Sequence, residues 1–110
     1  MMKLAMSPAA SGLLRALLQR AQVTRDRILL TDWRSTDWQS LTLIGERHRV
    51  RLRIPGPNAL EVADRLTTGL EEAEFTIPGQ IVADIQQSGA SRAMADGSVE
   101  LSIEALTVEE

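Results

Sequence analysis

The residues best suited to binding are two tryptophans and a row of arginines. Residues 31–35 read Thr-Asp-Trp-Arg-Ser and residues 36–40 read Thr-Asp-Trp-Gln-Ser, so the tryptophans hold equivalent places in a tandem repeat. The chain has only three aromatic residues, and tryptophan and arginine are enriched at interaction hot spots. The candidate interaction surface is Trp33, Trp38, Arg47, Arg49, Arg51 and Arg53.

With a period of five residues, neither a continuous strand nor a helix places both repeat copies on the same face. In a strand an odd step places the two copies on opposite faces, and in a helix it rotates them by roughly 140°. A turn between the copies resolves this conflict. We therefore predict a four-residue hairpin loop over residues 34–37, which makes Trp33 and Trp38 directly opposed cross-strand partners.

A second hairpin is predicted directly after the first. Gly45 followed by Glu46 fits a two-residue type II′ turn. That register pairs Leu41 with Val50, and Trp38 with Arg53. Both turns then agree on one apolar face and one polar face, because both loops contain an even number of residues. The apolar face is Ile28, Leu30, Leu41, Leu43, Val50, Leu52 and Ile54. The polar face is Leu29, Thr31, Trp33, Trp38, Ser40, Thr42 and the four arginines.

Helical spacing and turn signals define the remaining elements. Ser7 and Pro8 are a cap and a first-turn proline for a helix over 8–23. A second helix follows Asn58 and ends at Gly69. Alternating apolar residues predict strands near 81–85 and 99–105, with a bulge or strand end near Ala105.

These elements predict one α+β domain over residues 1–110, with residues 1–6 and 109–110 frayed. The order is α-βββ-α-ββ, a two-layer sandwich in which two helices cover one face of a mostly antiparallel five-stranded sheet. We expect the fifth strand to lie beside the third. That placement sets Glu100 and Glu104 across from the arginine row.

Charge and composition limit the classes of function. The chain has 110 residues and a net charge of −3, which is the sum of +6 over residues 1–55 and −9 over residues 56–110. Without cysteine it has no disulfide and no thiol nucleophile. No segment reaches the ~18 apolar residues that a spanning helix needs. The start does not resemble a signal peptide, so we expect a bacterial, cytoplasmic protein without membrane contact.

Nothing in the residue inventory indicates catalysis. The single histidine, His48, falls on the predicted apolar side, which favours a structural role. Ser35 or Ser40 could be grouped with His48 and Asp37 as a triad, but the predicted register turns His48 away from Ser40. No nucleotide-binding, metal-binding or hydrolase motif is present. We therefore predict a protein that is not an enzyme and has no cofactor or metal.

Four interpretations of the tryptophan and arginine residues stay open. The first is self-association as a homodimer at micromolar concentration, or contact with another protein, through an uncovered sheet face. The second is binding of single-stranded nucleic acid on the same face, which a pI near 5.2 disfavours. The third is an enzyme subunit without a known motif. The fourth is a solvated face whose arginines pair with carboxylates.

Overall fold

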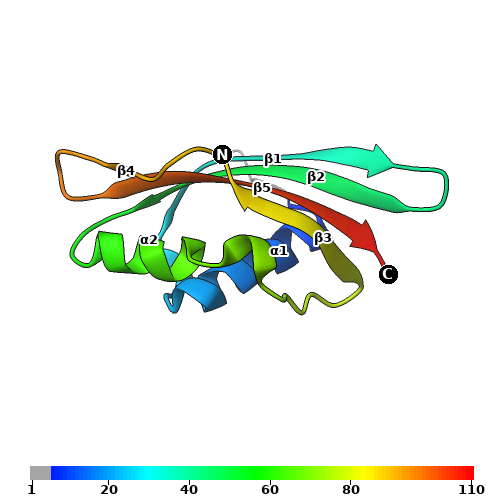
Figure 1. Cartoon of the computed structure of the whole chain (residues 1–110), viewed down its shortest axis with the longest axis horizontal. Helices are drawn as coiled ribbons and strands as arrows, with labels where there is room; N and C mark the ends of the chain where they lie inside the picture. The colour runs from blue at the N-terminus through cyan, green and yellow to red at the C-terminus, as the bar shows by residue number, and fades with distance from the viewer. Residues whose placement is uncertain (1–5) are drawn as a thin grey trace.

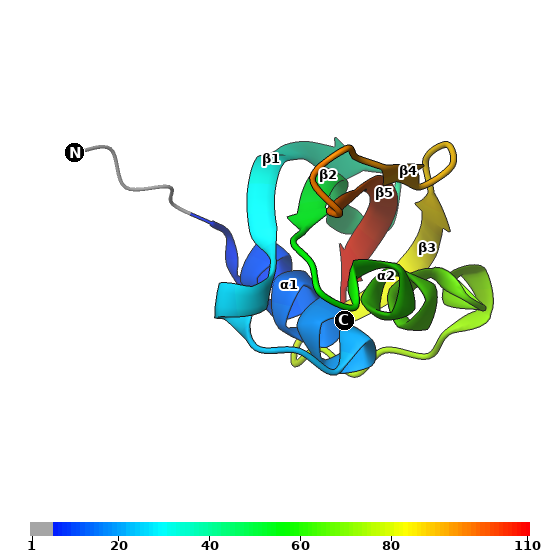
Figure 2. The same ribbon diagram turned by 90° about the vertical axis from the view of Figure 1, so that its left-hand side faces the viewer.

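The computed structural model describes residues 6–110 and has two layers, with both helices on one face of a sheet (Figures 1 and 2). The helices are α1 (Pro8–Ala21) and α2 (Ala59–Thr67), with short 3-10 turns η1 (Arg25–Arg27) and η2 (Leu70–Glu72). The strands are β1 (Leu29–Gln39), β2 (Ile44–Ile54), β3 (Gln80–Gln87), β4 (Arg92–Ala93) and β5 (Val99–Glu109). The sheet order is β1-β2-β5-β3, and β4 also pairs with β5.

The predicted fold class is confirmed, but the strands are divided differently between the two halves. Two helices pack on a five-stranded antiparallel sheet, as expected. The order is α-ββ-α-βββ, because two strands rather than three lie between the helices and a short β4 is added after α2. Helix α1 begins as predicted, since the Ala10 amide donates to the Ser7 hydroxyl at 3.1 Å and Pro8 opens the first turn.

The predicted hairpin between the two repeat copies is wrong. Residues 29–39 form one continuous strand, and the chain turns at Ser40–Leu43 instead, where the Ser40 amide donates to the Leu43 carbonyl at 2.9 Å. Gly45 is not in a turn but in β2, pressed against β5: a Cβ on it would lie 2.0 Å from the carbonyl oxygen of Thr107. This close approach needs a glycine, which accounts for the residue without any turn.

The core lies between the helices and the inner face of the sheet. Its largest fully buried side chains come from α1, α2, β2 and β5, and burying each stabilises the fold by about 2 kcal/mol. They include Leu13, Leu17, Leu52, Ile54, Leu66, Leu101 and Ile103. Leu41 and Leu43, predicted to join this core, are exposed near the turn because the hairpin end extends beyond the helices (Figure 1).

The pairing of β2 with β5 is the confirmed long-range prediction. Arg49 lies opposite Glu104, and Arg53 lies opposite Glu100. The predicted bulge or strand end near Ala105 is wrong, because β5 continues to Glu109 and pairs with β2 without a break. The irregularity lies in β3, which has a bulge between Val82 and Asp84. That bulge shifts the alternation of β3, so Ile81 is exposed whereas Ile85 is buried.

The two ends of the chain were predicted to be frayed. Residues 1–5 of the predicted leader lie outside the described residues, and Met6 is half-buried. At the other end the prediction is wrong, because Glu109 belongs to β5 and the Glu110 amide donates to the Gly79 carbonyl at 3.1 Å. None of the helices within residues 6–110 is long and apolar enough to cross a bilayer.

Candidate interaction surfaces

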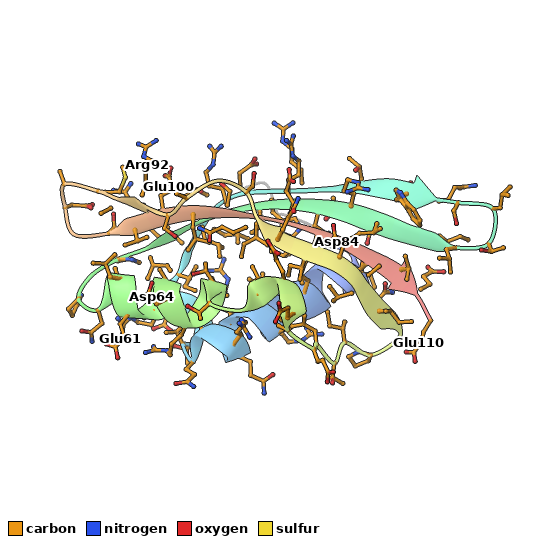
Figure 3. The ribbon with its side chains drawn as sticks, in the orientation of Figure 1. Glu61, Asp64, Asp84, Arg92, Glu100 and Glu110 are labelled. Carbon is orange, nitrogen blue, oxygen red and sulfur yellow. The ribbon has the colours of Figure 1, made fainter. Side chains whose placement is uncertain are left out.

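The arginine row occupies the sheet face that the helices leave uncovered. Along β2 the even-numbered residues from His48 to Ile54 are buried, and the arginines between them point away from the core. Figure 3 shows side chains that end in nitrogen rising from this uncovered face. The predicted placement of Arg47, Arg49, Arg51 and Arg53 is therefore confirmed, because a strand with one buried face fixes it.

Carboxylates neutralise part of this row. The guanidinium of Arg49 lies 3.2 Å from the Glu104 carboxylate. That of Arg53 lies 2.8 Å from Asp96 rather than reaching Glu100. Arg47 and Arg51 make no ion pair within residues 6–110. Arg47 and Arg51 thus keep guanidinium groups without an ion-pair partner among these residues, although Asp32 lies directly opposite Arg51 and Glu100 lies opposite Arg53 on the same face.

A fifth arginine, which sequence reasoning missed, makes this charge denser. Arg34 on β1 lies directly opposite Arg49, and its own partner is Asp32 at 3.7 Å. Like charges opposite one another destabilise a sheet pair. Arg34, Arg47, Arg49 and Arg51 form what we call the arginine cluster. All of these except Arg47 line a hollow of about 220 Å³, together with Asp32 and Glu104. The signal for Arg34 was present in the repeat, but the predicted loop removed it from the strand.

Trp33 does not lie on the arginine face. It pairs with Val50, so it points toward the helix layer and packs half-buried against the core. Its indole nitrogen donates to the Ser35 hydroxyl at 2.9 Å, and its ring meets the His48 ring edge-on, with centroids 6.1 Å apart. Trp33 is therefore neither the partner of Trp38 nor a member of the outer surface.

His48 is fully buried and hydrogen-bonded at both ring nitrogens. Its Nδ1 lies 2.7 Å from the Ser35 hydroxyl, and its Nε2 lies 2.9 Å from the Thr107 hydroxyl. The Thr107 hydroxyl donates to the Glu46 carbonyl at 3.5 Å, so the Thr107 oxygen accepts the hydrogen on His48 Nε2. Nδ1 of the neutral ring then accepts the hydrogen of the Ser35 hydroxyl. Burial lowers the pKa of His48, and the nearby Glu46 carboxylate only partly opposes that effect. These groups form the histidine network, a structural element tying β1, β2 and β5 together.

The histidine network does place Ser35 on a histidine, which the predicted register did not foresee. Acyl-transfer triads need a carboxylate on the second imidazole nitrogen, to orient the ring and stabilise its charged form. Here that nitrogen meets the hydroxyl of Thr107. Asp37 lies opposite Glu46, and Ser40 lies at the turn. Among the described residues no carboxylate hydrogen-bonds to His48, so the grouping of Ser35, His48 and Asp37 as a triad is not formed.

Trp38 lies on the outer face, at the far end of the hairpin. It pairs with Gly45, not with Arg53 as predicted. Gly45 pairs in turn with Val108 on β5, and Val108 pairs with Ile81 on β3. Leu41 is fully exposed, and Ile44 is 60% exposed. With Leu43 and Trp38 they form what we call the hairpin end. Sequence analysis assigned Leu41 and Leu43 to the core and Trp38 to the polar face, and only the second assignment is correct.

No strand within residues 6–110 pairs with the outer edge of β1. The closing pair of the hairpin is Ser40 and Leu43, and hydrogen-bonded pairs alternate along antiparallel strands. Counting back along the regular register directs the backbone groups of Trp33, Ser35, Asp37 and Gln39 away from β2. Within residues 6–110 no strand and no turn hydrogen bond satisfies them.

The described residues 6–110 contain no group of three His, Cys, Asp or Glu side chains that could hold a metal ion. No protein-family model matches the chain, and no curated protein is significantly similar to it. Function must therefore be argued from the surfaces themselves.

Proposed function

We propose that the chain is a small non-catalytic interaction module that self-associates through its β1–β2 hairpin. The observation that carries the proposal is the hairpin itself. It combines the unpaired edge of an 11-residue strand with the apolar hairpin end, beyond the cover of the helices (Figure 1).

The two sheet edges differ in their suitability for pairing. A regular unpaired edge is a template for another strand, and natural proteins blunt such edges with bulges, prolines and charges. Strand β3 is blunted, since it follows Pro78 and bulges before Asp84. Strand β1 also shifts its register, between Leu30 and Asp32, but it is then regular over the eight residues from Asp32 to Gln39. Its edge and the adjoining apolar side chains together favour a protein partner over solvent.

The mass of the protein in solution tests this proposal. We expect a homodimer by sedimentation or light scattering between about 1 and 100 μM, a range that fits a modest interface. A monomer at about 100 μM, the upper end of that affinity range, overturns the proposal.

Matched variants locate the contact. Replacing Leu41 and Ile44 together by serine should weaken the dimer at least about tenfold, because the buried apolar area is lost. The control replaces Leu60 on α2 and Ile81 on β3, which are 63% and 50% exposed away from the β1–β2 hairpin, and should leave the mass unchanged. Equal weakening by both pairs would move the interface away from the hairpin.

A second candidate is an anionic partner, such as single-stranded nucleic acid, on the arginine cluster. The supporting observation is that Arg47 and Arg51 lack ion pairs within residues 6–110 while Arg34 faces Arg49. Binding of labelled oligonucleotides should then fall steeply between about 50 and 200 mM salt. It should also fall in the Arg47→Gln plus Arg51→Gln variant. No binding at about 50 mM salt rejects this candidate.

A further inference from the structure

Strand β1 offers its free backbone groups in a pattern that a second β1 can satisfy. The groups facing outward belong to Trp33, Ser35, Asp37 and Gln39, at every second position. An antiparallel copy of the same strand presents the same pattern in reverse. Two copies can therefore exchange backbone hydrogen bonds over this whole segment, without any rearrangement of either sheet.

Symmetry limits how two β1 strands can pair. Residues directly opposite one another in a sheet point to the same face, and a two-fold axis perpendicular to the sheet keeps faces matched. The axis must therefore pass beside one residue, which then faces itself. It cannot pass between residues 35 and 36, since that would set Trp33 against Trp38, which lie on opposite faces. Within the regular segment Asp32–Gln39, a two-fold axis centred beside Ser35 or beside Thr36 lets most of the unpaired backbone groups form hydrogen bonds.

The outer-face charges distinguish these two centres. A centre at Ser35 sets Arg34 opposite Thr36 and brings the two Arg34 side chains within about 8 Å of each other. Each Arg34 already lies in an arginine cluster, so this centre joins two positive clusters. A centre at Thr36 separates them by roughly 13 Å along the strand. It also sets Arg34 directly opposite Trp38 of the other copy, twice, at a separation suited to cation–π contact.

Resting on the proposed self-association, we infer that two copies pair their β1 strands antiparallel about a two-fold axis beside Thr36. One sheet then runs through both copies, from β3 of the first to β3 of the second. Ser35 pairs with Asp37 of the other copy, and Trp33 with Gln39, each through backbone bonds. In this arrangement both halves of the tandem repeat take part in the contact. Arg34, from the first repeat unit of one chain, lies opposite Trp38, from the second repeat unit of the other chain.

The arrangement has a cost on the inner face. Asp37 lies opposite Glu46 within one chain, and the two-fold axis brings the second Asp37 within about 8 Å. Asp37→Asn should therefore tighten the dimer at low salt, and the gain should shrink as salt screens the carboxylates. Unchanged or weaker association in this variant contradicts a centre at Thr36.

Disulfide trapping tests the centre directly, because the chain contains no cysteine of its own. Thr36 is exposed and faces itself across the axis, at a Cα separation of about 4.5 Å that a disulfide can span. In the same arrangement the two Ser35 residues are about 8 Å apart, too far to be bridged. Under mild oxidation Thr36→Cys should give a covalent dimer, and the matched control Ser35→Cys should not.

Each other outcome is decisive. Cross-linking of Ser35→Cys alone shifts the centre by one residue, and equal cross-linking of both variants means that no fixed register exists; either result overturns the inference. A wild-type dimer in which neither variant cross-links also overturns it, while the proposed self-association stands. A wild-type monomer overturns both.

A second variant reports on the cross-copy contact without cysteine. Arg34→Gln removes both Arg–Trp contacts and should weaken the dimer about tenfold. The control Arg51→Gln lies on the same face of β2 but four residues beyond Arg47, the residue opposite Thr36, and should leave the dimer unchanged. Equal effects of the two variants contradict the arrangement, since they would reflect overall charge only.

Discussion

The two copies of the tandem repeat have nearly the same sequence and opposite environments. In the first copy Trp33 points toward the helices, donates to Ser35 and contacts His48. In the second, Trp38 lies on the outer face across from Gly45, at a hairpin end without helix cover. The first copy belongs to the structure of the core, and the second to the surface.

This difference follows from the period of the repeat. Five is odd, so on one continuous strand every residue of the second copy points to the face opposite its counterpart. A repeat of even period would have placed both tryptophans on one face. An odd repeat in a strand therefore gives one sequence two roles, and four kinds of measurement can break or sharpen the contrast.

The largest effect is expected at Gly45, which holds the second copy against β5. A Cβ there meets the Thr107 carbonyl at 2.0 Å, and backbone on both sides cannot yield. Gly45→Ala should lower the free energy of unfolding by about 3 kcal/mol or more, measured by urea titration. The control is Gly12→Ala, where the contact at 2.5 Å is the Cγ2 methyl of Ile77, a side chain rather than backbone, and the loss should be smaller. An equal loss at both positions would mean that β5 is not held so close.

The tryptophans themselves come next. Trp33→Ala removes a half-buried ring from the core and a donor from Ser35, which should cost about 2 kcal/mol of unfolding free energy. Trp38→Ala should cost under about 1 kcal/mol in the monomer, yet weaken self-association. Thermal denaturation at low protein concentration measures the first effect, and sedimentation measures the second. The reverse ranking would contradict the assignment of the two copies to core and surface.

The histidine network makes the first copy sensitive to pH. Because burial lowers the pKa of His48 below its usual 6.5, the unfolded chain binds a proton before the folded chain does. Stability should be constant above pH 7 and should fall below about pH 6.5, by up to about 1.4 kcal/mol per pH unit. His48→Gln should remove this slope between pH 7 and 5, and Trp33 fluorescence should report the change, since its ring contacts His48. An identical slope in the variant would assign it to carboxylates instead.

The smallest effect concerns the arginine cluster. Glu104→Gln removes the partner of Arg49, which then faces Arg34 alone, and should cost about 0.5–1 kcal/mol at low salt. Glu61→Gln breaks a comparable exposed pair with Arg65 on α2, where no second arginine faces it, and should cost less. Both costs should shrink with salt. A larger loss of stability in Glu61→Gln than in Glu104→Gln would mean that the repulsion between Arg34 and Arg49 does not affect stability measurably.

Local patterns predicted much of the fold because their physical causes are local. Ser7 and Pro8 define the start of α1 through backbone groups within one turn. The alternation along β2 separates His48 from the arginines, because successive side chains of a strand point to opposite faces. Glu100 and Glu104 were placed across from the arginine row by charge, and the β2–β5 pairing confirms it.

The hairpin failed because its signals have two meanings. Serine, threonine and aspartate favour turns, but they are also compatible with an exposed edge strand such as β1. From the sequence alone, the pair Gly45-Glu46 indicates a two-residue turn. Only contact with Thr107, more than sixty residues later in the chain, shows that Gly45 is required within a strand.

Side-chain alternation and capping could thus be read from the residues alone, since they depend on neighbours within a few positions. The location of the turn, the face given to each tryptophan and the meeting of Ser35 with His48 required the assembled sheet. They depend on which strands lie side by side, and that choice is made by burial of the whole core and by the close approach of β5 to Gly45. The sequence contains two nearly identical segments, and their packing places the two tryptophans in different environments.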